Sequence, residues 1–457
     1  MGHAAHRKPN TFLILKLMHF LLSVGLFYCF WLIFRYNCIF TIEDKGFRYN
    51  YLITGGYAAI LYFFMHIYGA YLIGYSRIRT LAIAQFMAQG FACVLVYIGV
   101  TIAWAKVRNP AIFILLLLIQ GILDCMYSYG TSAYFRRIHP PKKTLLIYRN
   151  IVDKKRFGSI VGKPVGLIYK VVKELQYDGS SFKDIEHCLK DYDAVFVAGI
   201  NSRTRNGIIK YCVENDVPGF FLPHVGDILM KGSQHIQTFS SPVHFFSFKH
   251  NKLEYLFVKR LFDIVASICA LVLLSPIMLV TAIAIKTYDG GPAIYKQVRL
   301  TKDGNRFNIM KFRSMKVDAE KDGVARLSTG DHDDRVTPIG RFIRKCRIDE
   351  LPQLFNILKG DMSIVGPRPE RPEIAEQYYK TLPDFQLRLQ VKAGLTGYAQ
   401  VYGKYNSDPY EKLEFDLLYI NEMGIITDLT LIFATISILF VSDSTEGIEE
   451  SHTTAID

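Results

Sequence analysis

Paired cysteines are missing from this sequence, although it contains eight cysteines in 457 residues. A metal knot or a disulfide framework needs cysteines at short, repeated spacings. These eight are scattered instead, at positions 29, 38, 93, 125, 188, 212, 269 and 346. They are therefore expected to be reduced thiols with a structural role.

Recognisable nucleic-acid-binding motifs are also missing, since there is no zinc-finger spacing, no aromatic RNA-binding signature and no continuous basic helix. The chain is nevertheless basic, with 54 Lys and Arg against 41 Asp and Glu. Residues 286–347 alone hold 15 basic and 8 acidic side chains, which is more than half of the net charge of +13. This stretch follows an apolar segment, so the expected partners are phosphate groups at a membrane surface, and no nucleic acid.

Half of the residues are hydrophobic, and the long apolar runs lie mainly in the first third of the chain. Four runs, at about 12–34, 52–74, 81–105 and 110–130, have the length that a membrane-spanning helix needs. Basic residues precede the first run, separate the second from the third and follow the fourth, which predicts that both ends of this region are cytoplasmic. The first run lacks a small-residue cleavage site and is expected to be retained.

Short apolar strands alternate with helical patterns between about 144 and 250. The strands are expected at 144–148, 194–200 and 219–222, and one helix at 204–215. This alternation predicts a small, doubly wound, Rossmann-like sheet. Tyr148 is not followed by the GxGxxG turn of a dinucleotide site, so a structural or regulatory domain is favoured over a nucleotide sensor.

A fifth apolar run, at 261–285, has Ser275 and Pro276 at its middle. Proline removes a helix donor and clashes with the preceding turn, so a kink or break is expected there. The run is either a kinked fifth span or a re-entrant helix-break-helix. Lys259, Arg260 and Asp263 precede it and are expected at the lipid headgroups.

Two adjacent carboxylates, Asp349 and Glu350, form the strongest candidate site. Pro352 follows them, which predicts that Asp349 stands at a helix N-terminus. A simple N-cap would explain an aspartate at this place. The basic surroundings favour a chemical role, because Arg344 and its basic neighbours precede the pair and Arg368 follows it. Cations lower a carboxyl pKa and also attract a diphosphate.

Two further blocks accompany the carboxylates. One is Lys-Phe-Arg-Ser-Met, with Lys311 and Arg313, and the other is Ser-Ile-Val-Gly-Pro-Arg-Pro, with Arg368. In the second block glycine permits a tight turn and the prolines stiffen the chain, which suits the presentation of Arg368 to a phosphate. Each block alone could be an ordinary surface turn.

Together these blocks resemble the bacterial sugar transferase family, the monotopic polyprenyl-phosphate hexose-1-phosphate transferases. The resemblance covers nearly all of residues 255–440, and the first 250 residues are similar to the larger members with four membrane helices and a Rossmann-like module. The sequence segments that carry the resemblance are 259–263, 275–276, 291–292, 297–299, 311–315, 334–337, 349–354, 360–369 and 394–397.

The resemblance implies a two-step reaction. Asp349 would attack the sugar-proximal phosphate of a UDP-sugar, releasing UMP, and undecaprenyl phosphate would then take the phosphosugar. Glu350, with Asp349, would help to hold Mg²⁺. Arg344 and Arg368 match the phosphate-binding arginines of the family, whereas Lys311 and Arg313 would bind phosphate, brace the fold or meet headgroups. UDP-galactose and UDP-glucose are the expected donors, although relatives also use N-acetylated and diacetamido sugars.

The expected fold is that of a mixed membrane protein with three parts. Residues 1–138 form a four-helix transmembrane bundle, residues 139–250 a Rossmann-like α/β domain, and residues 251–457 a mostly α-helical catalytic domain. A fifth crossing would carry that domain outside, away from cytoplasmic nucleotide sugars, so the re-entrant helix at about 257–286 is preferred. The implied location is the bacterial inner membrane with a cytoplasmic catalytic domain, and large members of the family imply a homodimer.

Two other functions compete with this one. One is a catalytically inactive membrane scaffold or sensor in polysaccharide assembly, which would have the same fold but no transferase activity. The intact carboxylates and arginines argue against this loss of activity. A one-step transferase without a covalent intermediate would be membrane-embedded throughout, which the basic C-terminal half does not suit.

Overall fold

The computed structural model describes residues 9–38, 48–74, 76–138, 140–161, 168–237, 242–245, 253–317, 335–403 and 408–438. Contacts divide the chain into two compact units, residues 1–223 and 224–457. The first unit contains a helical bundle and a parallel sheet, and the second is mostly helical. The outer limits of the three expected domains stay a prediction.

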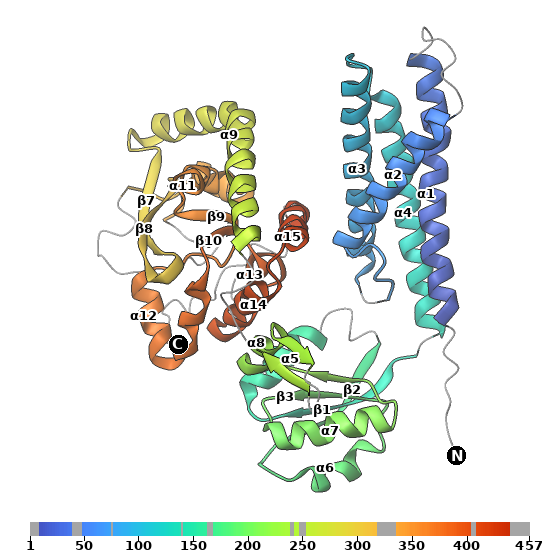
Figure 1. The fold of residues 1–457 in the computed structure, drawn as a ribbon, viewed down its shortest axis with the longest axis vertical. Helices are drawn as coiled ribbons and strands as arrows, with labels where there is room; N and C mark the ends of the chain where they lie inside the picture. Colours follow the sequence, from blue (N-terminus) through green and yellow to red (C-terminus); the bar gives the residue numbers. More distant parts are fainter. Residues whose placement is uncertain are drawn as a thin grey trace. The chain divides into compact units, whose positions relative to one another are not determined.

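Four helices form the bundle of the first unit (Figure 1). Helix α2 packs on α1 and α3, and α4 packs on α3 and α1, which closes the ring. Their bounds are α1 (Pro9–Cys38), α2 (Arg48–Ile67), α3 (Ile78–Ala103) and α4 (Ala111–Ile138). Long stretches of α1, α3 and α4 are apolar enough to cross a membrane, and the described part of the chain holds one more such helix, at Glu254–Asp289.

The second expected span differs from the structure at its end. We expected it to reach residue 74, but α2 ends at Ile67. Residues 68–74 form turns in which Gly69 and Gly74 have φ angles of 64° and 82°. Glycine adopts these left-handed angles without a steric penalty, so the apolar sequence continues where the helix stops.

Polar side chains fill the middle of this bundle. His19 Nε2 of α1 lies 2.9 Å from Asp124 Oδ1 of α4, and the same oxygen accepts a hydrogen bond of 3.1 Å from Gln89 of α3. Gln89 also donates to Ser23 at 3.0 Å. All four side chains are buried. Buried polar groups must find partners inside the protein, so this network fixes how α1, α3 and α4 pack together.

The rest of the first unit is a parallel sheet with strand order β2-β1-β3-β4. The strands are β1 (Lys142–Tyr148), β2 (Tyr169–Gln176), β3 (Ala194–Ala198) and β4 (Gly219–Phe221). The helices between them are α5 (Ile151–Val161), α6 (Phe182–Leu189) and α7 (Ser202–Glu214). The expected strands and the helix at 204–215 are thus confirmed, with ends that differ by a few residues.

Both faces of this sheet are covered. Leu145, Val195 and Val197 pack in one apolar cluster with Ile208 of α7, while Phe196 lies in a second cluster with Phe157 of α5. Successive strand residues point to opposite faces, so a strand buried on both sides is apolar at every position. The continuous apolar run 194–198 therefore has a direct structural cause.

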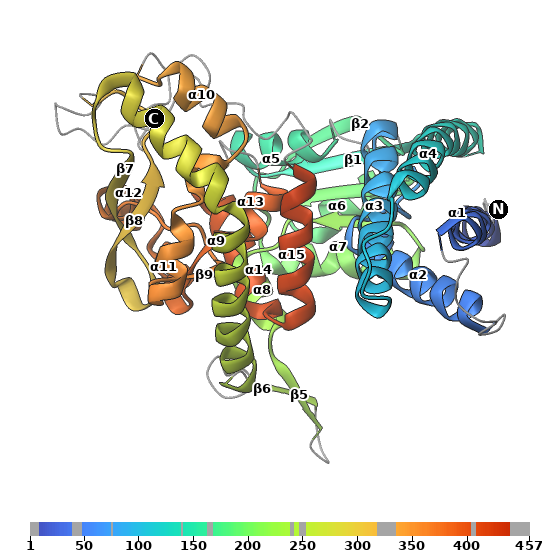
Figure 2. The same cartoon turned by 90° about the horizontal axis from the view of Figure 1, so that it is seen from above.

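The second unit is built around short strands and many helices (Figures 1 and 2). Its strand pairs are β5 (Gln234–Gln237) with β6 (Pro242–Phe245), β7 (Ile294–Leu300) with β8 (Arg306–Phe312), and β9 (Met362–Val365) with β10 (Ala393–Thr396). Its helices are α8 (Val225–Lys231), α9 (Leu253–Asp289), α10 (Pro338–Lys345), α11 (Gln353–Lys359), α12 (Pro372–Thr381), α13 (Tyr398–Tyr402), α14 (Pro409–Glu422) and α15 (Ile425–Ile438). Its described residues also form the 3-10 helices η2 (Lys302–Gly304), η4 (Ile348–Glu350) and η5 (Pro383–Gln390).

Helix α9 is continuous where we expected a break. It runs for 37 residues with Pro276 inside it, and the ribbon bends sharply part way along (Figure 1). Ser275 Oγ donates to the carbonyl of Val272 at 2.8 Å, so this hydroxyl bonds within the helix. A proline kink with such local partners bends a helix without ending it. The expected helix-break-helix is therefore a bent helix.

The start of α9 is attached to the rest of the unit. Arg260 donates to the carbonyls of Ile357 and Leu358 at the end of α11, at 2.6 and 2.8 Å. Asp263, 3% exposed, accepts from Ser363 Oγ at 2.7 Å. Asp263 is therefore bonded inside the protein and does not face the lipid headgroups as expected, whereas a headgroup contact of the partly buried Arg260 stays a prediction.

Lys259 is held in the same way, by Asp428 of α15 at 2.7 Å. Both side chains are about nine-tenths buried. The three polar residues at the head of α9 therefore join the apolar helix to the region around β9, α11 and α15.

The polar network of the bundle leads to a stability prediction. Asp124→Ala removes the acceptor shared by His19 and Gln89, and we expect a loss of about 1–2 kcal/mol because two buried donors lose their partner. Thermal unfolding in detergent should show this as a melting temperature lower by several degrees. The neighbouring exposed Cys125→Ala is the matched control. Equal melting temperatures for the two variants would contradict the packing role of Asp124.

Candidate active site

The two carboxylates lie in a single turn of 3-10 helix, η4, between α10 and α11. Arg347 precedes this turn with a left-handed backbone, φ 56°. We expected Asp349 at the N-terminus of a helix, but α11 begins only at Gln353, after Pro352 as its N-cap. The electrostatic environment of the pair therefore comes from charged side chains rather than from a helix end.

Three cations surround Glu350. Its Oε1 lies 3.2 Å from Lys311 Nζ, 3.2 Å from Arg368 Nη2 and 3.9 Å from Arg347 Nη1. Burial alone would raise the pKa of Glu350, but Lys311, Arg368 and Arg347 outweigh burial and lower it. Glu350 is thus a permanent anion at any physiological pH.

Asp349 has the opposite character, although it is the next residue. It is 8% exposed, and its Oδ1 is buried without a hydrogen-bond partner among the described residues. Burial and the neighbouring charge of Glu350 raise the pKa of Asp349 to about 6, against the opposing effect of Lys311, Arg344 and Arg347. This carboxylate is ionised at neutral pH and has a lone pair that no described protein group uses, which are the properties of a nucleophile.

The cations come from separate elements. Lys311 stands on β8, and burial lowers its pKa while Glu350 opposes that effect. Arg368 belongs to the loop after β9, and Arg344 to the last turn of α10. Arg344 Nε donates to Ser314 Oγ at 2.8 Å, which fixes its guanidinium beside the carboxylates. The fold thus brings together Asp349, Glu350, Lys311, Arg344 and Arg368, as the sequence predicted.

Arg313 lies apart from this group. Its side chain is buried and its Nη2 forms an ion pair with Asp289 at the end of α9. A Cβ on Gly291 would lie 1.9 Å from Arg313 Nη1, so the guanidinium packs directly on the turn after α9. These contacts match the role of a fold brace, one of the alternatives expected for Arg313, and its phosphate-binding role stays a prediction.

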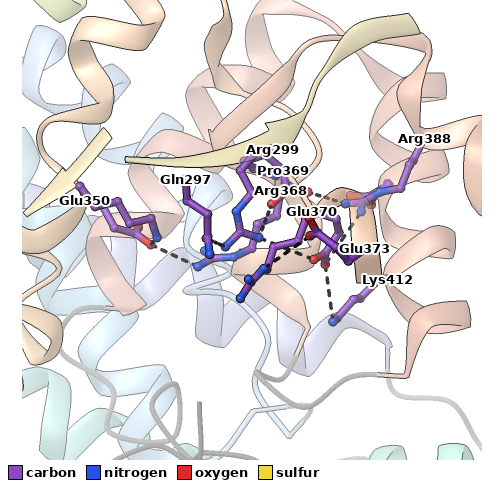
Figure 3. Close-up of polar contacts among 12 residues, drawn as sticks. Gln297, Arg299, Glu350, Arg368, Pro369, Glu370, Glu373, Arg388 and Lys412 are labelled. Carbon is purple, nitrogen blue, oxygen red and sulfur yellow. Dashed lines mark hydrogen bonds and ion pairs between the residues drawn. The ribbon is translucent and has the colours of Figure 1, made fainter. Parts of the chain in front are cut away.

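Sequence reasoning missed several charged residues around the Arg368 loop. Arg299 and Arg388 donate to the backbone of this loop, and Glu370 lies between them (Figure 3). Arg347 was not missed, because it belongs to the basic group that directly precedes Asp349 in the sequence. Arg388 gives no such signal, because it is 39 residues from Asp349 and resembles any other arginine of an amphipathic segment.

The carboxylates also suit a magnesium ion. Among the described residues no group of three or more His, Cys, Asp or Glu side chains could hold a metal ion. Mg²⁺ does not require such a cluster, because it retains waters and is commonly held by one or two carboxylates together with substrate phosphates. The unpartnered oxygen of Asp349 and the anionic Glu350 are the donors that this chemistry needs.

Comparison with known proteins places the similarity in this same region. Residues 254–442 match the family model described as bacterial sugar transferase. The chain is 45% identical over 191 residues to a UDP-glucose:undecaprenyl-phosphate glucose-1-phosphate transferase of Klebsiella pneumoniae, covering 41% of each chain. It is 43% identical over 185 residues to a UDP-N-acetylgalactosamine-undecaprenyl-phosphate N-acetylgalactosaminephosphotransferase of Aeromonas hydrophila, covering 40% of this chain and 43% of the relative.

A shorter relative is covered more fully. The chain is 38% identical over 191 residues to a UDP-glucose:undecaprenyl-phosphate glucose-1-phosphate transferase of Caulobacter vibrioides, over 41% of this chain and 71% of that protein. The match to the two larger relatives thus spans less than half of their length, and the match to the shorter one spans most of it. The similarity to all three lies within 40–41% of this chain.

The raised pKa of Asp349 predicts a pH-dependent cost in stability. A carboxyl whose folded-state pKa lies above its unfolded value opposes folding above the folded pKa, and this penalty disappears below the unfolded pKa. Asp349→Asn should therefore raise the free energy of unfolding at pH 8, by up to about 3 kcal/mol for a shift from 3.8 to about 6. The gain should shrink through pH 6 and vanish near pH 4.

Thermal unfolding of both forms between pH 4 and pH 8 measures this difference. The exposed Asp303→Asn is a suitable control, since its side chain is 70% exposed and should leave the melting temperature unchanged. A melting temperature for Asp349→Asn that is lower than that of the wild type at pH 8 would show that the ionised aspartate stabilises the fold instead.

Proposed function

The chain belongs to the bacterial sugar transferase family, and on that premise we propose that it transfers a hexose 1-phosphate from a UDP-sugar to undecaprenyl phosphate. The products are UMP and an undecaprenyl-diphospho-sugar, and the reaction is the first membrane step of O-antigen, capsule or exopolysaccharide synthesis. The names of the relatives, which specify UDP-glucose or UDP-N-acetylgalactosamine and undecaprenyl phosphate, support this substrate class. UDP-glucose and UDP-galactose are the proposed donors.

One observation carries this proposal. Two adjacent carboxylates are surrounded by cations, and among the described residues these cations form hydrogen bonds with only one of the two carboxylates. Glu350 accepts from Lys311 and Arg368, while an oxygen of Asp349 is buried without a described partner. A diphosphate needs positive charge to approach two anions, and these cations supply it. Asp349 then has a free lone pair at the place where the phosphate would bind.

The chemistry proceeds in two displacements. In the first, an Asp349 oxygen bonds to the phosphorus beside the sugar, the bond from that phosphorus to the bridging oxygen breaks, and UMP leaves with the electron pair. In the second, an oxygen of undecaprenyl phosphate bonds to the same phosphorus, and the Asp349 carboxylate leaves. Arg344 and Arg368 orient the phosphate oxygens, and Lys311 helps to balance the charge.

Asp349 and Glu350 are the residues that would hold Mg²⁺. When bound, the ion supplies positive charge that offsets the diphosphate and the phosphoryl group in transit. The protein's own part is to keep Glu350 ionised, through Lys311, Arg368 and Arg347, so that a carboxylate is present for this purpose.

The proposal extends to topology and assembly. We place the catalytic unit on the cytoplasmic face of the inner membrane, with the bent helix α9 entering and leaving on that side. The bend in α9 and its protein-bound head support this arrangement (Figure 1). A homodimer and a structural or regulatory role of the parallel sheet belong to the same proposal.

An inactive scaffold or sensor is the alternative. Burying an oxygen of Asp349 without a hydrogen-bond partner costs folding free energy, and a scaffold would gain nothing in return for that cost. Catalytic assays therefore distinguish the two functions directly.

The two carboxylates should differ in their effect on turnover. Asp349→Asn should reduce UMP release by about 1,000-fold or more, because the nucleophile is lost, and Glu350→Gln by roughly 10- to 100-fold, because charge positioning is impaired. The rate of UMP release can be measured for both variants in membranes that are supplied with Mg²⁺, undecaprenyl phosphate and a labelled donor. The donors to test are UDP-glucose, UDP-galactose and UDP-N-acetylgalactosamine.

Asp303→Asn, exposed and far from the carboxylates in sequence, is the control and should keep wild-type activity. Equal UMP release by wild type and Asp349→Asn would refute the covalent route. Inactivity of the wild type with every sugar would favour the scaffold.

The position of residue 286 tests the membrane arrangement. Lys286 is exposed near the end of α9, and Arg48 is exposed at the start of α2, which we place on the outer side. In a cysteine-free background, Arg48→Cys should react with a membrane-impermeant thiol reagent in intact cells, whereas Lys286→Cys should react only after lysis. Labelling of Lys286→Cys from outside would mean that α9 crosses the membrane.

A further inference from the structure

The loop that carries Arg368 is held by two guanidinium groups, that of the buried Arg388 and that of the partly buried Arg299 (Figure 3). Arg388 Nη2 donates to the carbonyl of Arg368 at 2.7 Å, and Arg299 Nη1 donates to the next carbonyl, that of Pro369, at 3.2 Å. Consecutive carbonyls of one loop are therefore each held by a separate arginine. Glu350, the partner of the Arg368 side chain, lies on another element, η4.

Arg388 is itself held by several contacts. It is 3% exposed, its Nε donates to Asp416 Oδ2 at 2.8 Å, and its guanidinium lies 4.7 Å from the ring centre of Phe385. Asp416 stands on α14 and is 1% exposed. A buried arginine with a buried counter-ion keeps its charge and has few alternative orientations. Arg388 thus reaches the loop as a rigid donor.

Arg299 holds the loop from the side of β7. Its Nη2 donates to Gln297 Oε1 at 2.6 Å, and its Nη1 lies 3.9 Å from Glu370 Oε2. Burial lowers the pKa of Arg299 to about 10, which leaves it protonated at neutral pH. The carboxylate of Glu370 lies between the two arginines, 3.9 Å from Arg299 Nη1 and 4.0 Å from Arg388 Nη1.

The loop backbone has little freedom of its own. Pro367 and Pro369 fix their φ angles on either side of Arg368. Gly366 donates to the carbonyl of Thr396 at 2.8 Å, and a Cβ at Gly366 would lie 2.4 Å from the carbonyl oxygen of Lys392. The carbonyl of Pro367 accepts from Gly394 at 2.8 Å. The main chain is therefore held before, at and after Arg368.

We propose that Arg388, with Asp416 behind it, is a positioning residue that directs the Arg368 side chain at the diphosphate of the donor. This inference rests on the proposed function. Arg388 touches no reacting atom, and it acts by fixing the peptide from which Arg368 extends. Arg299 has the same role from the opposite side of the loop. An error of about 1 Å in the position of a phosphate-binding group lowers the rate strongly, which is why such buried support matters.

A purely structural role would give a different result. Arg388 also joins η5 to α14 through Asp416, so its loss could simply destabilise the unit. Destabilisation reduces the amount of folded enzyme but leaves the kcat of each folded molecule unchanged. A positioning role lowers kcat per folded molecule, and it does so only while Arg368 is present to be positioned.

A double-mutant cycle separates these roles. Arg388→Lys keeps a positive charge for Asp416 but cannot hold both Asp416 and the loop carbonyl in the same way. Per folded molecule, we expect kcat to fall about 10- to 30-fold for Arg388→Lys and roughly 100-fold for Arg368→Ala. The double variant should equal Arg368→Ala within about 2-fold, because the positioned group is already absent.

Arg306→Lys is the matched control, since Arg306 is 68% exposed on β8 and should keep wild-type kcat. If Arg388→Lys does not fold, the same cycle with Arg299→Lys decides the question. Independent losses that multiply in the double variant, or an unchanged kcat for the folded single variants, would overturn the positioning role. Absence of wild-type activity would instead overturn the proposed function on which it rests.

Discussion

The structure around the two carboxylates depends on the charge balance at Glu350. Lys311 and Arg368 lie 3.2 Å from one of its oxygens, and Arg347 lies 3.9 Å from it. These cations keep a buried carboxylate ionised, and burial together with that fixed negative charge raises the pKa of its neighbour Asp349. Two identical functional groups thus acquire different properties from their surroundings alone. Glu350 pairs with the surrounding cations, and Asp349, with one oxygen that no described group uses, is the proposed nucleophile.

The same principle of buried charge supports the site from a distance. Arg388 and Arg299 hold the loop of Arg368, and Arg260 and Asp263 hold the head of α9 against α11 and β9. Each of these groups is bonded to backbone or to a buried partner, so breaking one contact leaves an unsatisfied charge. The apolar helix and the catalytic residues are therefore parts of one bonded framework.

The sequence predicted those parts of the structure that depend on local order. Asp349 and Glu350 are adjacent, Arg368 lies between two prolines, and the strand 194–198 is apolar throughout. Each of these features can be recognised from a few consecutive residues. The network of Arg388 and Asp416 could not be predicted, because its two residues come from different elements and only the fold joins them. Lys259 and Asp263 were assigned to lipid because a basic residue beside an apolar run commonly has that role, and their protein partners lie about a hundred or more residues away. Pro276 predicted a disturbance of α9, but local hydrogen bonds decide between a bend and a break.

The proposed two-step reaction requires that the Asp349 carboxylate become esterified by a phosphosugar. The most direct measurement is intact-protein and peptide mass spectrometry of the enzyme quenched with a UDP-sugar and Mg²⁺ before undecaprenyl phosphate is added. A covalent intermediate would add the mass of one hexose phosphate to the peptide that contains residue 349, and this added mass should be lost when the lipid is supplied. Turnover that continues while no such adduct forms on that peptide would contradict it.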